Sequence, residues 1–339
     1  MKILAIETSC DETSAAVVED GRRVCSDIIS SQIDIHRRFG GVVPEIASRH
    51  HIEDVLPVVD LALTEANLTL SEIDAVAVTQ GPGLVGALLV GVSAAKALSY
   101  AAEKPLLAVH HMEGHIYANL VAHPDLEPPF LTLVVSGGHT MLVDVPAYNE
   151  FHLLGETKDD AAGEAFDKIA RVMGYPYPGG PEIDQLAKKG NPHAILFPQA
   201  MRNDDNYDFS FSGVKSAVIN YLHHKEQIGE IYSSEDVAAS FQEAVVEVLV
   251  EKTIRAAMAC YRKTICVAGG VAANSALRTH LTMAAKKRGM CVLAPTPRLC
   301  TDNAVMIGAR AYYQWQAKDM ADWSLNADPR LPFTCGEKI

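Results

Sequence analysis

The feature that most constrains the fold is a strand–turn–strand pattern that occurs near the start of each half of the chain. The first copy has apolar runs at Lys2–Glu7 and Ser14–Val18 around an acidic, polar turn. The second has runs at 130–136 and 140–145 around Gly137-Gly138-His139. Short apolar runs joined by such turns predict hairpins. Two hairpin-led halves predict two related domains, residues 1–127 and 128–339, with a cleft between them.

The remaining patterns are those of an α/β protein, with a mixed sheet flanked by helices in each domain. Further strands are expected at 73–79, 106–109 and 264–267, and helices at 84–101, from His111 onward, at 234–261 and, after Gly269-Gly270, to Lys286. A last helix is expected at about 302–317.

Composition excludes several classes of protein. With 339 residues and 48% hydrophobic content, two domains are expected rather than one. Seven cysteines without a C-x-x-C pair predict reduced thiols and argue against a disulfide framework or a zinc ribbon. No uncharged apolar stretch reaches the length of a membrane span, and the first residues do not form a secretory leader. A cytoplasmic protein without membrane attachment is expected.

The formal net charge of -13 is unfavourable for nonspecific attraction to a phosphate backbone. If nucleic acid is a substrate, local basic runs or partner subunits must supply positive charge. Three runs are candidates, although most such runs are solvated surface: Arg22-Arg23, His36-Arg37-Arg38 and Lys286-Lys287-Arg288.

Two imidazoles four residues apart, His111 and His115, point the same way if the segment is helical, and they could hold one metal ion. Such a pair also arises by chance on a solvated helix. The turns Ser136-Gly137-Gly138 and Gly269-Gly270 offer backbone amides that could bind a phosphate or carboxylate. Neither turn matches the P-loop or the dinucleotide-binding motif, and each could be a plain turn.

Two hairpin-led domains with a Gly-Gly turn and a following helix resemble the fold of actin, sugar kinases and heat-shock ATPases. This resemblance implies that the last helix, at about 302–317, packs back on the first domain, so the boundary near residue 127 describes the order of the chain better than its arrangement in space. Five motifs, in order along the chain from Ile3 to about Ile307, resemble those of the TsaD family of bacterial tRNA threonylcarbamoyl transferases, which were once labelled glycoproteases. These motifs are Glu7-Thr8-Ser9-Cys10-Asp11-Glu12-Thr13, Gly41-Val42-Val43-Pro44-Glu45, His111-Met112-Glu113-Gly114-His115, Ser136-Gly137-Gly138-His139-Thr140 and Gly269-Gly270-Val271-Ala272-Ala273-Asn274.

The resemblance implies transfer of a threonylcarbamoyl group from threonylcarbamoyl-adenylate to N6 of the adenosine 3' of the anticodon, in tRNAs that read codons beginning with A, with release of AMP. It implies one Fe²⁺ or Zn²⁺ per subunit, with His111, His115 and Asp302 as ligands. Two imidazoles and a carboxylate would leave coordination positions open for oxygen atoms of a ligand. A nucleotide or adenylate in the cleft, with or without Mg²⁺, is expected as well.

The resemblance also implies which residues bind the adenylate. Backbone amides of the second hairpin would bind its phosphate, Asp167 and Asp184 its ribose hydroxyls, and Asn274 its adenine edge, while Gly180 would let the backbone approach the nucleoside. The complete predicted set is Val134, Val135, Ser136, Gly137, Gly138, Asp167, Gly180, Asp184 and Asn274.

Asp11 and Glu12 lie in the first hairpin turn, which faces the cleft in this fold. A carboxylate there could orient the tRNA amine or accept its proton, and we take Asp11 as the candidate base. Glu12 could equally be a structural acid. The acidic balance agrees with a family whose bacterial members need companions, namely a paralogous TsaB-like subunit that forms a heterodimer through helices of the first domain, and a TsaE-like ATPase. A separate synthase would supply the adenylate.

Three other functions compete with transfer. A metallopeptidase is disfavoured because Met112 stands where the motif H-E-x-x-H has its glutamate. An ATPase or sugar kinase of the same fold would release phosphate with magnesium and would tolerate His111→Ala. A noncatalytic scaffold would have little need for both histidines together with Asp302.

Overall fold

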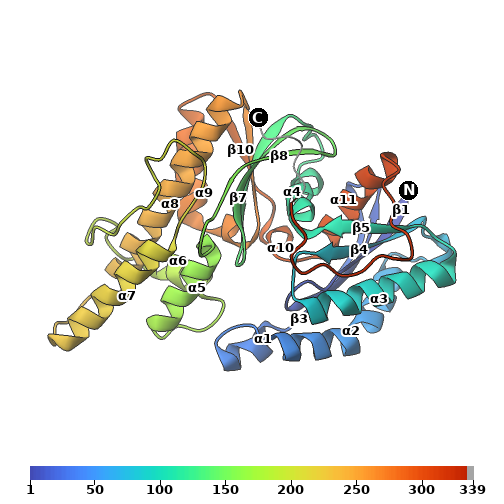
Figure 1. Ribbon diagram of the computed structural model, residues 1–339, viewed down its shortest axis with the longest axis horizontal. Coiled ribbons are helices and arrows are strands. Elements are labelled where there is room, and N and C mark those ends of the chain that lie inside the picture. Colours follow the sequence, from blue (N-terminus) through green and yellow to red (C-terminus); the bar gives the residue numbers. More distant parts are fainter. Residues whose placement is uncertain (334–339) are drawn as a thin grey trace. The chain divides into compact units, whose positions relative to one another are not determined.

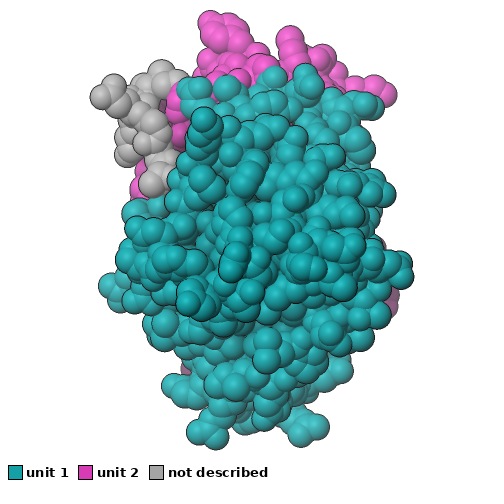
Figure 2. Space-filling model, turned by 90° about the vertical axis from the view of Figure 1, so that its right-hand side faces the viewer, with its two compact units in different colours: residues 1–128, 147–150, 295–334 teal, residues 129–146, 151–294, 335–339 magenta. Residues whose placement is uncertain are grey.

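A computed structural model describes residues 1–333 of the chain. These residues form two compact units (Figure 2). The first consists of Met1–Pro128, Ala147–Glu150 and the segment from Pro295 to the last described residue. The second consists of Pro129–Pro146 and Phe151–Ala294. The sequence placed 128–339 in the second domain and expected the helix at about 302–317 to pack back on the first. The units differ from these bounds, because the turn at 147–150 and the whole described segment from Pro295 pack with the first.

A five-stranded sheet of order β3-β2-β1-β4-β5 forms the centre of the first unit (Figure 1). Its strands are β1 (Lys2–Glu7), β2 (Glu12–Glu19), β3 (Arg23–Ser31), β4 (Ala75–Gly81) and β5 (Leu106–His110). The predicted first hairpin is confirmed, since β1 and β2 are antiparallel, with Glu7 opposite Ser14. β4 and β5 then run parallel to β1. Strand β3 was not predicted, because its half-buried residues lack a continuous apolar run.

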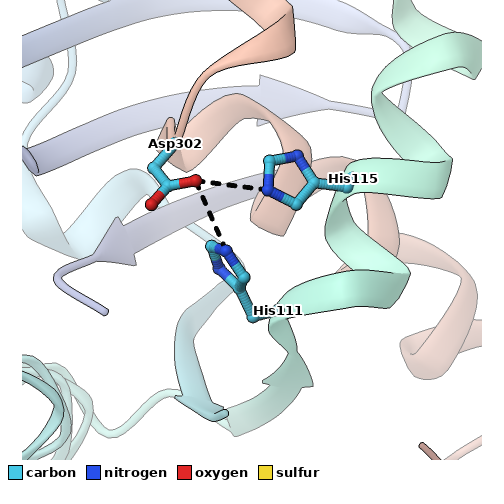
Figure 3. A group of neighbouring side chains, drawn as sticks. All are labelled: His111, His115 and Asp302. Atoms are coloured by element: carbon cyan, nitrogen blue, oxygen red, sulfur yellow. Dashed lines mark ion pairs between the residues drawn. The ribbon is translucent and has the colours of Figure 1, made fainter. Parts of the chain in front are cut away.

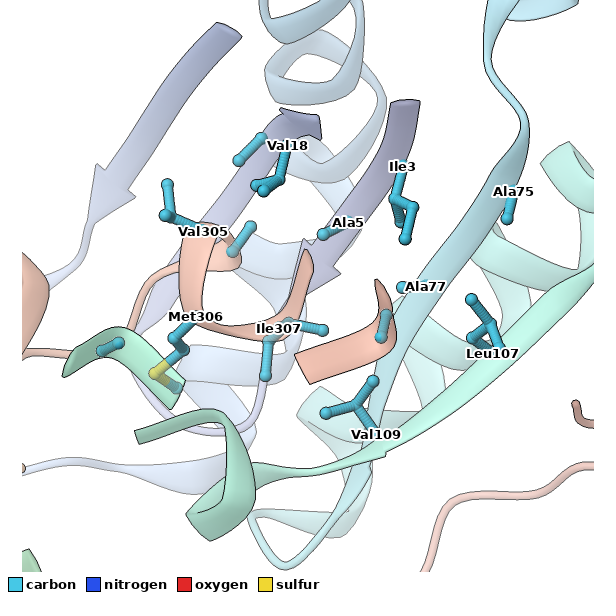
Figure 4. Packing of buried hydrophobic residues seen from close by; sticks show 14 residues of the cluster. Ile3, Ala5, Val18, Ala75, Ala77, Leu107, Val109, Val305, Met306 and Ile307 are labelled. Carbon is cyan, nitrogen blue, oxygen red and sulfur yellow. The ribbon is translucent and has the colours of Figure 1, made fainter. Parts of the chain in front are cut away.

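Helices bury both faces of this sheet. The helices of the first unit are α1 (Ile33–His36), η1 (Arg37–Phe39), α2 (Pro44–Glu65), η2 (Leu70–Glu72), α3 (Val85–Ala102), α4 (His111–Ala122), α10 (Pro297–Cys300) and α11 (Ala304–Gln316). Val305, Met306 and Ile307 of α11 pack against Ile3, Ala5 and Val18 of β1 and β2 (Figure 4). On the opposite face, side chains of α2 and α3 cover Leu4, Ile6, Val76 and Val78.

Among the described residues one helix, α3, is long and apolar enough to cross a membrane by length and composition alone. It carries Lys96, whose ammonium donates to the carbonyl of Leu325. Val92 and Ala95 of this helix belong to the core under the sheet. One face of α3 therefore packs in the core of the first unit, while other side chains of the helix, such as Val85, are exposed.

The second unit repeats the strand arrangement of the first. Its sheet has the order β10-β9-β6-β7-β8, and its strands are β6 (Phe130–Val135), β7 (Thr140–Ala147), β8 (Glu150–Glu156), β9 (Thr264–Ala268) and β10 (Cys291–Leu293). The second predicted hairpin is confirmed by the antiparallel pair β6 and β7, with Val135 opposite Thr140. As in the first unit, a parallel strand, β9, lies on the other side of the first hairpin strand. The related halves inferred from the sequence are thus related in topology.

Helices of the second unit are α5 (Ala162–Val172), α6 (Gly179–Ala187), α7 (Ser212–Gln227), α8 (Ser234–Ala259), η3 (Gly270–Ala273) and α9 (Ser275–Lys286). Helix α8 is buried along most of its length, Lys252 included. The Lys252 ammonium donates to the carbonyls of Asn206 (3.2 Å) and Asp208 (2.5 Å). A buried lysine therefore fixes the irregular segment that leads into α7.

Candidate metal and nucleotide sites

His111, His115 and Asp302 come together within the first unit (Figure 3). One potential ligand atom from each of the three lies within 4.8 Å of the other two. Oδ1 of Asp302 is 3.4 Å from Nε2 of His111 and 3.2 Å from Nε2 of His115. Both imidazoles are buried, whereas the Asp302 side chain is 20% exposed. Two nitrogens and a carboxylate oxygen thus converge on one point, and the side chain of Asp302 is the most exposed of the three.

Glu7, at the end of β1, orients the first imidazole from behind. Its Oε2 lies 3.1 Å from Nδ1 of His111 and accepts a hydrogen bond of 2.5 Å from the Thr79 hydroxyl, while its Oε1 accepts from the Ser9 amide. The carboxylate therefore favours a proton on Nδ1, so that loss of the second ring proton would leave a lone pair on Nε2, on the side of Asp302. A carboxylate behind a histidine is the usual second layer of a metal site.

His115 has a different environment. Both of its ring nitrogens are buried without a hydrogen bond in the described part of the chain, although Nε2 is close to Asp302. A buried polar atom without a partner is costly, and a bound cation would satisfy Nε2. The donor set of two imidazoles and a carboxylate suits a first-row transition metal such as iron or zinc. The three residues therefore fit the metal that the resemblance implies.

Electrostatics ties the acids and the first imidazole into one charged group. Burial disfavours charge on His111, but the Asp302 and Glu7 carboxylates outweigh it and raise the pKa of this imidazole to about 10. Burial alone would raise the pKa of both acids. The positive charge on His111 outweighs burial and lowers the pKa of Asp302 and of Glu7. Burial lowers the pKa of His115. In the absence of metal, the positive charge beside Asp302 and Glu7 is thus that of protonated His111.

Close packing of α4 against α11 brings Asp302 to the histidines. Gly114 lies between the two histidines in α4, and a Cβ there would come within 2.9 Å of Ile307. Asn303 caps α11 by accepting from the Met306 amide, so Asp302 directly precedes the helix. A second contact between the same two helices is the buried ion pair of 2.6 Å that Glu113 of α4 forms with Arg310 of α11. Glu113 therefore has a structural partner, and does not occupy the place of a peptidase glutamate.

The turn that carries Asp11 and Glu12 is buried and held from several sides. The backbone carbonyl of Asp11 accepts from the Gln32 amide at 3.0 Å, and that of Cys10 lies 2.8 Å from Nε2 of His51. Glu12 begins β2 and accepts a hydrogen bond from the Ser31 hydroxyl. Burial, followed by the charges of Asp11 and Asp302, raises the pKa of Glu12 well above its ordinary value. Glu12 therefore tends to keep a proton in the metal-free protein.

In the second unit the two predicted glycine turns meet. A Cβ on Gly269, which has a φ of +86°, would come within 2.4 Å of the Val135 carbonyl, so glycine is required there. Space is open beside Gly137, Gly138 and Gly270, and these backbones are accessible. Val134 and Val135 are buried in β6, so any contact they make with a ligand would involve their backbone.

The other predicted adenylate residues lie around α6 and α9, and their polar atoms already have partners. Asp167 accepts from the Gly179 amide at 2.7 Å, at the start of α6. Asp184 accepts from the Ser275 hydroxyl at 2.8 Å. Asn274 caps α9 and donates to Gln242 at 2.7 Å. Space beside Gly180 is open. The fold thus gathers Gly180, Asp184 and Asn274 around the beginnings of two helices.

Several residues that build these sites were not predicted. Glu7 was part of a quoted motif, but its role behind His111 was not assigned; an acid that ends a buried strand was the available signal. Gly163 lies so close to Ser136 that a Cβ would be 2.4 Å from the Ser136 carbonyl. Ser275, which bonds Asp184, follows a predicted residue directly and carried no signal of its own.

Comparison with known proteins assigns the chain. Residues 23–309 match the model of the family TsaD, described as tRNA N6-adenosine threonylcarbamoyltransferase. The chain belongs to the TsaD family. The protein of this name from Moorella thermoacetica is 61% identical over 330 residues, covering 97% of this chain and 96% of that protein. The protein of the same name from Clostridium perfringens is 60% identical over 329 residues, with 97% of each chain covered.

Solved structures confirm the fold. T. kodakarensis HypF matches 96% of this TsaD-family chain with a TM-score of 0.63 and 14% identity, over 49% of its own length. Component A of the Acidaminococcus fermentans (R)-2-hydroxyglutaryl-CoA dehydratase matches 93% of the chain and 98% of its own, with a TM-score of 0.56 and 14% identity. The predicted actin-like and ATPase-like fold is thus confirmed. The TsaD-family chain is a transferase that modifies N6 of adenosine in tRNA.

Proposed function

We propose that the chain transfers a threonylcarbamoyl group from threonylcarbamoyl-adenylate to N6 of the adenosine 3' of the anticodon, in tRNAs that read codons beginning with A. The C–O bond between the carbamoyl carbon and AMP breaks, a C–N bond to N6 forms, and N6 loses one proton. The observation that carries the proposal is the convergence of His111, His115 and Asp302, in which the buried Nε2 of His115 lies 3.2 Å from the Asp302 carboxylate and makes no hydrogen bond to any described residue.

We propose that these three residues hold one Fe²⁺ or Zn²⁺ per subunit. When bound, such an ion supplies positive charge that stabilises developing negative charge on carbamoyl or phosphate oxygens. Glu7 holds the His111 ring in place, and a ligand that is held in one orientation favours binding of a metal ion. The proposed reaction is transfer and not peptide hydrolysis. The Glu113 carboxylate is paired with Arg310, so it does not serve as the glutamate base that a metallopeptidase needs.

Adenine N6 is a weak nucleophile, so catalysis rests mainly on positioning and on charge stabilisation. Asp11 would orient the amine and accept its proton, with the backbone of its turn fixed by Gln32 and His51. Glu12, with its raised pKa, would stay protonated beside Asp11 and limit repulsion between the acids. Asp11→Asn retaining full turnover would remove Asp11 from this role.

The adenylate is proposed to bind in the second unit through the residues named from the sequence. The open backbones at Gly137, Gly138 and Gly270 suit the phosphate, with or without Mg²⁺. Gly180, Asp184 and Asn274 would meet the nucleoside. Because Asp167, Asp184 and Asn274 already have protein partners, they would bind it with their remaining acceptor positions or by exchanging partners.

The proposed partners are a TsaB-like paralogue, a TsaE-like ATPase and a synthase that supplies the adenylate, in the cytoplasm. Support for a protein partner comes from the outer sides of α2 and α3. Ile52 and Leu56 of α2 are 65% and 59% exposed, and Val85 of α3 is 55% exposed. These helices pack together, and exposed apolar side chains on adjacent helices favour burial against a second, helical subunit.

The test supplies labelled threonylcarbamoyl-adenylate and unmodified tRNA to the purified chain with its companions. We expect wild type to label the tRNA, and His115→Ala to lose both bound metal and transfer. His280→Ala is the control, because His280 is 38% exposed and lies outside the group. Equal transfer by wild type and His115→Ala would refute the metal-assisted step. Steady phosphate release from ATP without transfer would favour the ATPase alternative.

A further inference from the structure

The segment Arg37-Arg38-Phe39, which forms η1 between β3 and α2, projects basic and aromatic side chains from an acidic protein. The Arg37 side chain is 51% exposed, Arg38 is exposed, and Phe39 is 51% exposed. Exposed arginines beside an exposed ring are the combination that binds single-stranded RNA, through phosphate contacts and base stacking. We propose that this segment, called the η1 segment below, contacts the anticodon loop of the substrate tRNA. The inference rests on the proposed function.

The other two basic runs serve the proposal less well. Arg22 is committed to the protein, since it donates to the hydroxyls of Tyr313 (3.1 Å) and Tyr148 (2.9 Å) and to the carbonyls of Pro124 (2.7 Å) and Leu126 (2.9 Å). Arg23 is paired with Glu19. The run 286–288 is exposed but lies at the end of α9 in the second unit. Of the three, the η1 segment combines exposure with a place in the first unit.

The η1 segment is connected to the turn of Asp11 through two residues that precede it, Gln32 and His36. Gln32, just before α1, donates its amide to the Asp11 carbonyl at 3.0 Å. The Gln32 side chain lies 3.2 Å from Nε2 of the buried His36, whose Nδ1 accepts from the Val43 amide at 3.3 Å. The start and the end of the loop are therefore held on the same buried side chain. A tRNA loop resting on η1 would lie beside the proposed catalytic turn.

The conformation of η1 is set before any RNA binds. The Gly40 amide donates to the Arg37 carbonyl at 3.2 Å, and the Gly41 amide to the His36 carbonyl at 3.3 Å. Gly40 has a φ of +69°, in the region that favours glycine. An acid borders the segment, since Asp34, 89% exposed, pairs with Arg37 at 2.8 Å. A surface pair of this kind is weak, so a phosphate can replace it.

The experiment measures binding of unmodified tRNA to the full chain over a range of salt concentrations. We expect Arg37→Gln combined with Arg38→Gln to weaken binding about tenfold and to reduce the slope of log K against log salt by about 0.7 for every phosphate that these arginines neutralise in wild type. Phe39→Ala should weaken binding roughly tenfold, and Phe39→Tyr should restore it, because a tyrosine ring stacks as well. The matched control, Lys286→Gln with Lys287→Gln, removes the same charge and should bind like wild type.

Wild type that fails to bind tRNA at low salt, or η1 variants that bind like the control, would overturn the inference. A Phe39→Ala protein that binds tRNA normally but loses a protein partner would overturn it as well. Transfer is measured in parallel. Transfer by wild type with binding unaffected by η1 substitutions would leave the proposed function standing without the inference. Binding that depends on η1 without transfer would refute the proposed function alone.

Discussion

Glu7→Gln tests whether the His111 group is a metal site or a structural cluster. Glu7 is fully buried and makes its hydrogen bonds to the ring of His111, to Thr79 and to Ser9. The amide has the same shape but no charge, and one of its two ends donates where the carboxylate accepts. The imidazole then loses both its anionic partner and part of its orientation, while its distance from Asp302 is set by α4 and α11.

Loss of such a second layer weakens metal binding by about 10- to 100-fold, or ~1.4–2.7 kcal/mol. The measurement is competition between the protein and a chelator of known affinity for Zn²⁺, with Fe²⁺ as a second ion under anaerobic conditions. Thr79→Val is the graded control, because it removes one hydrogen bond to Glu7 and leaves the charge. We expect its loss of affinity to be clearly smaller than that of Glu7→Gln.

Far-ultraviolet circular dichroism and thermal unfolding establish that the variants are folded. If folded Glu7→Gln binds metal with the affinity of wild type, Glu7 does not support a metal ligand, and the reasoning from the buried carboxylate to a metal centre is refuted. If His115→Ala also binds metal normally, the three converging residues are not the site at all.

Three further predictions concern stability. In the metal-free protein Glu12→Gln should raise the free energy of unfolding more at pH 8 than at pH 5. The fold raises the pKa of Glu12, so above the pKa that this acid has in the unfolded chain, ionisation of Glu12 favours unfolding increasingly as pH rises. Equal gains at both pH values in urea titrations would contradict this. Lys252→Ala should destabilise by about 3 kcal/mol, measured by urea unfolding, since buried carbonyls lose their donor; a loss below ~1 kcal/mol would argue against the anchor. Gly269→Ala should lower the melting temperature by several degrees, because the added Cβ strains the backbone by roughly 1–3 kcal/mol. Gly270→Ala should not lower it, because the space around Gly270 is open. Equal melting temperatures of the two variants would show that the strand end moves freely.

The sequence predicted the architecture well because apolar runs and glycine turns are local signals. The two hairpins, the strand leading into the His111 helix and the helix after Gly269-Gly270 are all present. Strands β3 and β8 were missed, since half-buried strands do not have a continuous apolar run. That the last helix packs on the first unit was expected from the resemblance to this fold and not from composition, because the interior of α11 fits the sheet of the first unit through side-chain shape, as at Gly308 against Val18.

For the site, local spacing placed His111 and His115 on one face, but nothing in the spacing brought Asp302 there. That carboxylate came from the resemblance, and in the structure it lies just before α11, which packs closely on α4 beside Gly114. Residues that act behind the ligands were the hardest to see. Glu7 carries no pattern distinguishing it from any other acid at the end of a strand, and its role depends on a contact with a residue more than a hundred positions away.

A separation between an acidic reaction site and a basic contact surface would allow a strongly acidic chain to act on RNA. Acids are concentrated where the proposed chemistry needs them, at Glu7, Asp11, Glu12 and Asp302, and a bound cation would offset part of this charge. Repulsion of phosphate by such a site would favour presenting a neutral base to it, while the charged backbone is held at a distance. An exposed pair of arginines on a preformed loop next to the turn of Asp11 provides that arrangement. Substrate capture and reaction are then assigned to adjacent but electrostatically opposite surfaces of one unit, so removing the arginines should raise KM for tRNA and leave kcat nearly unchanged.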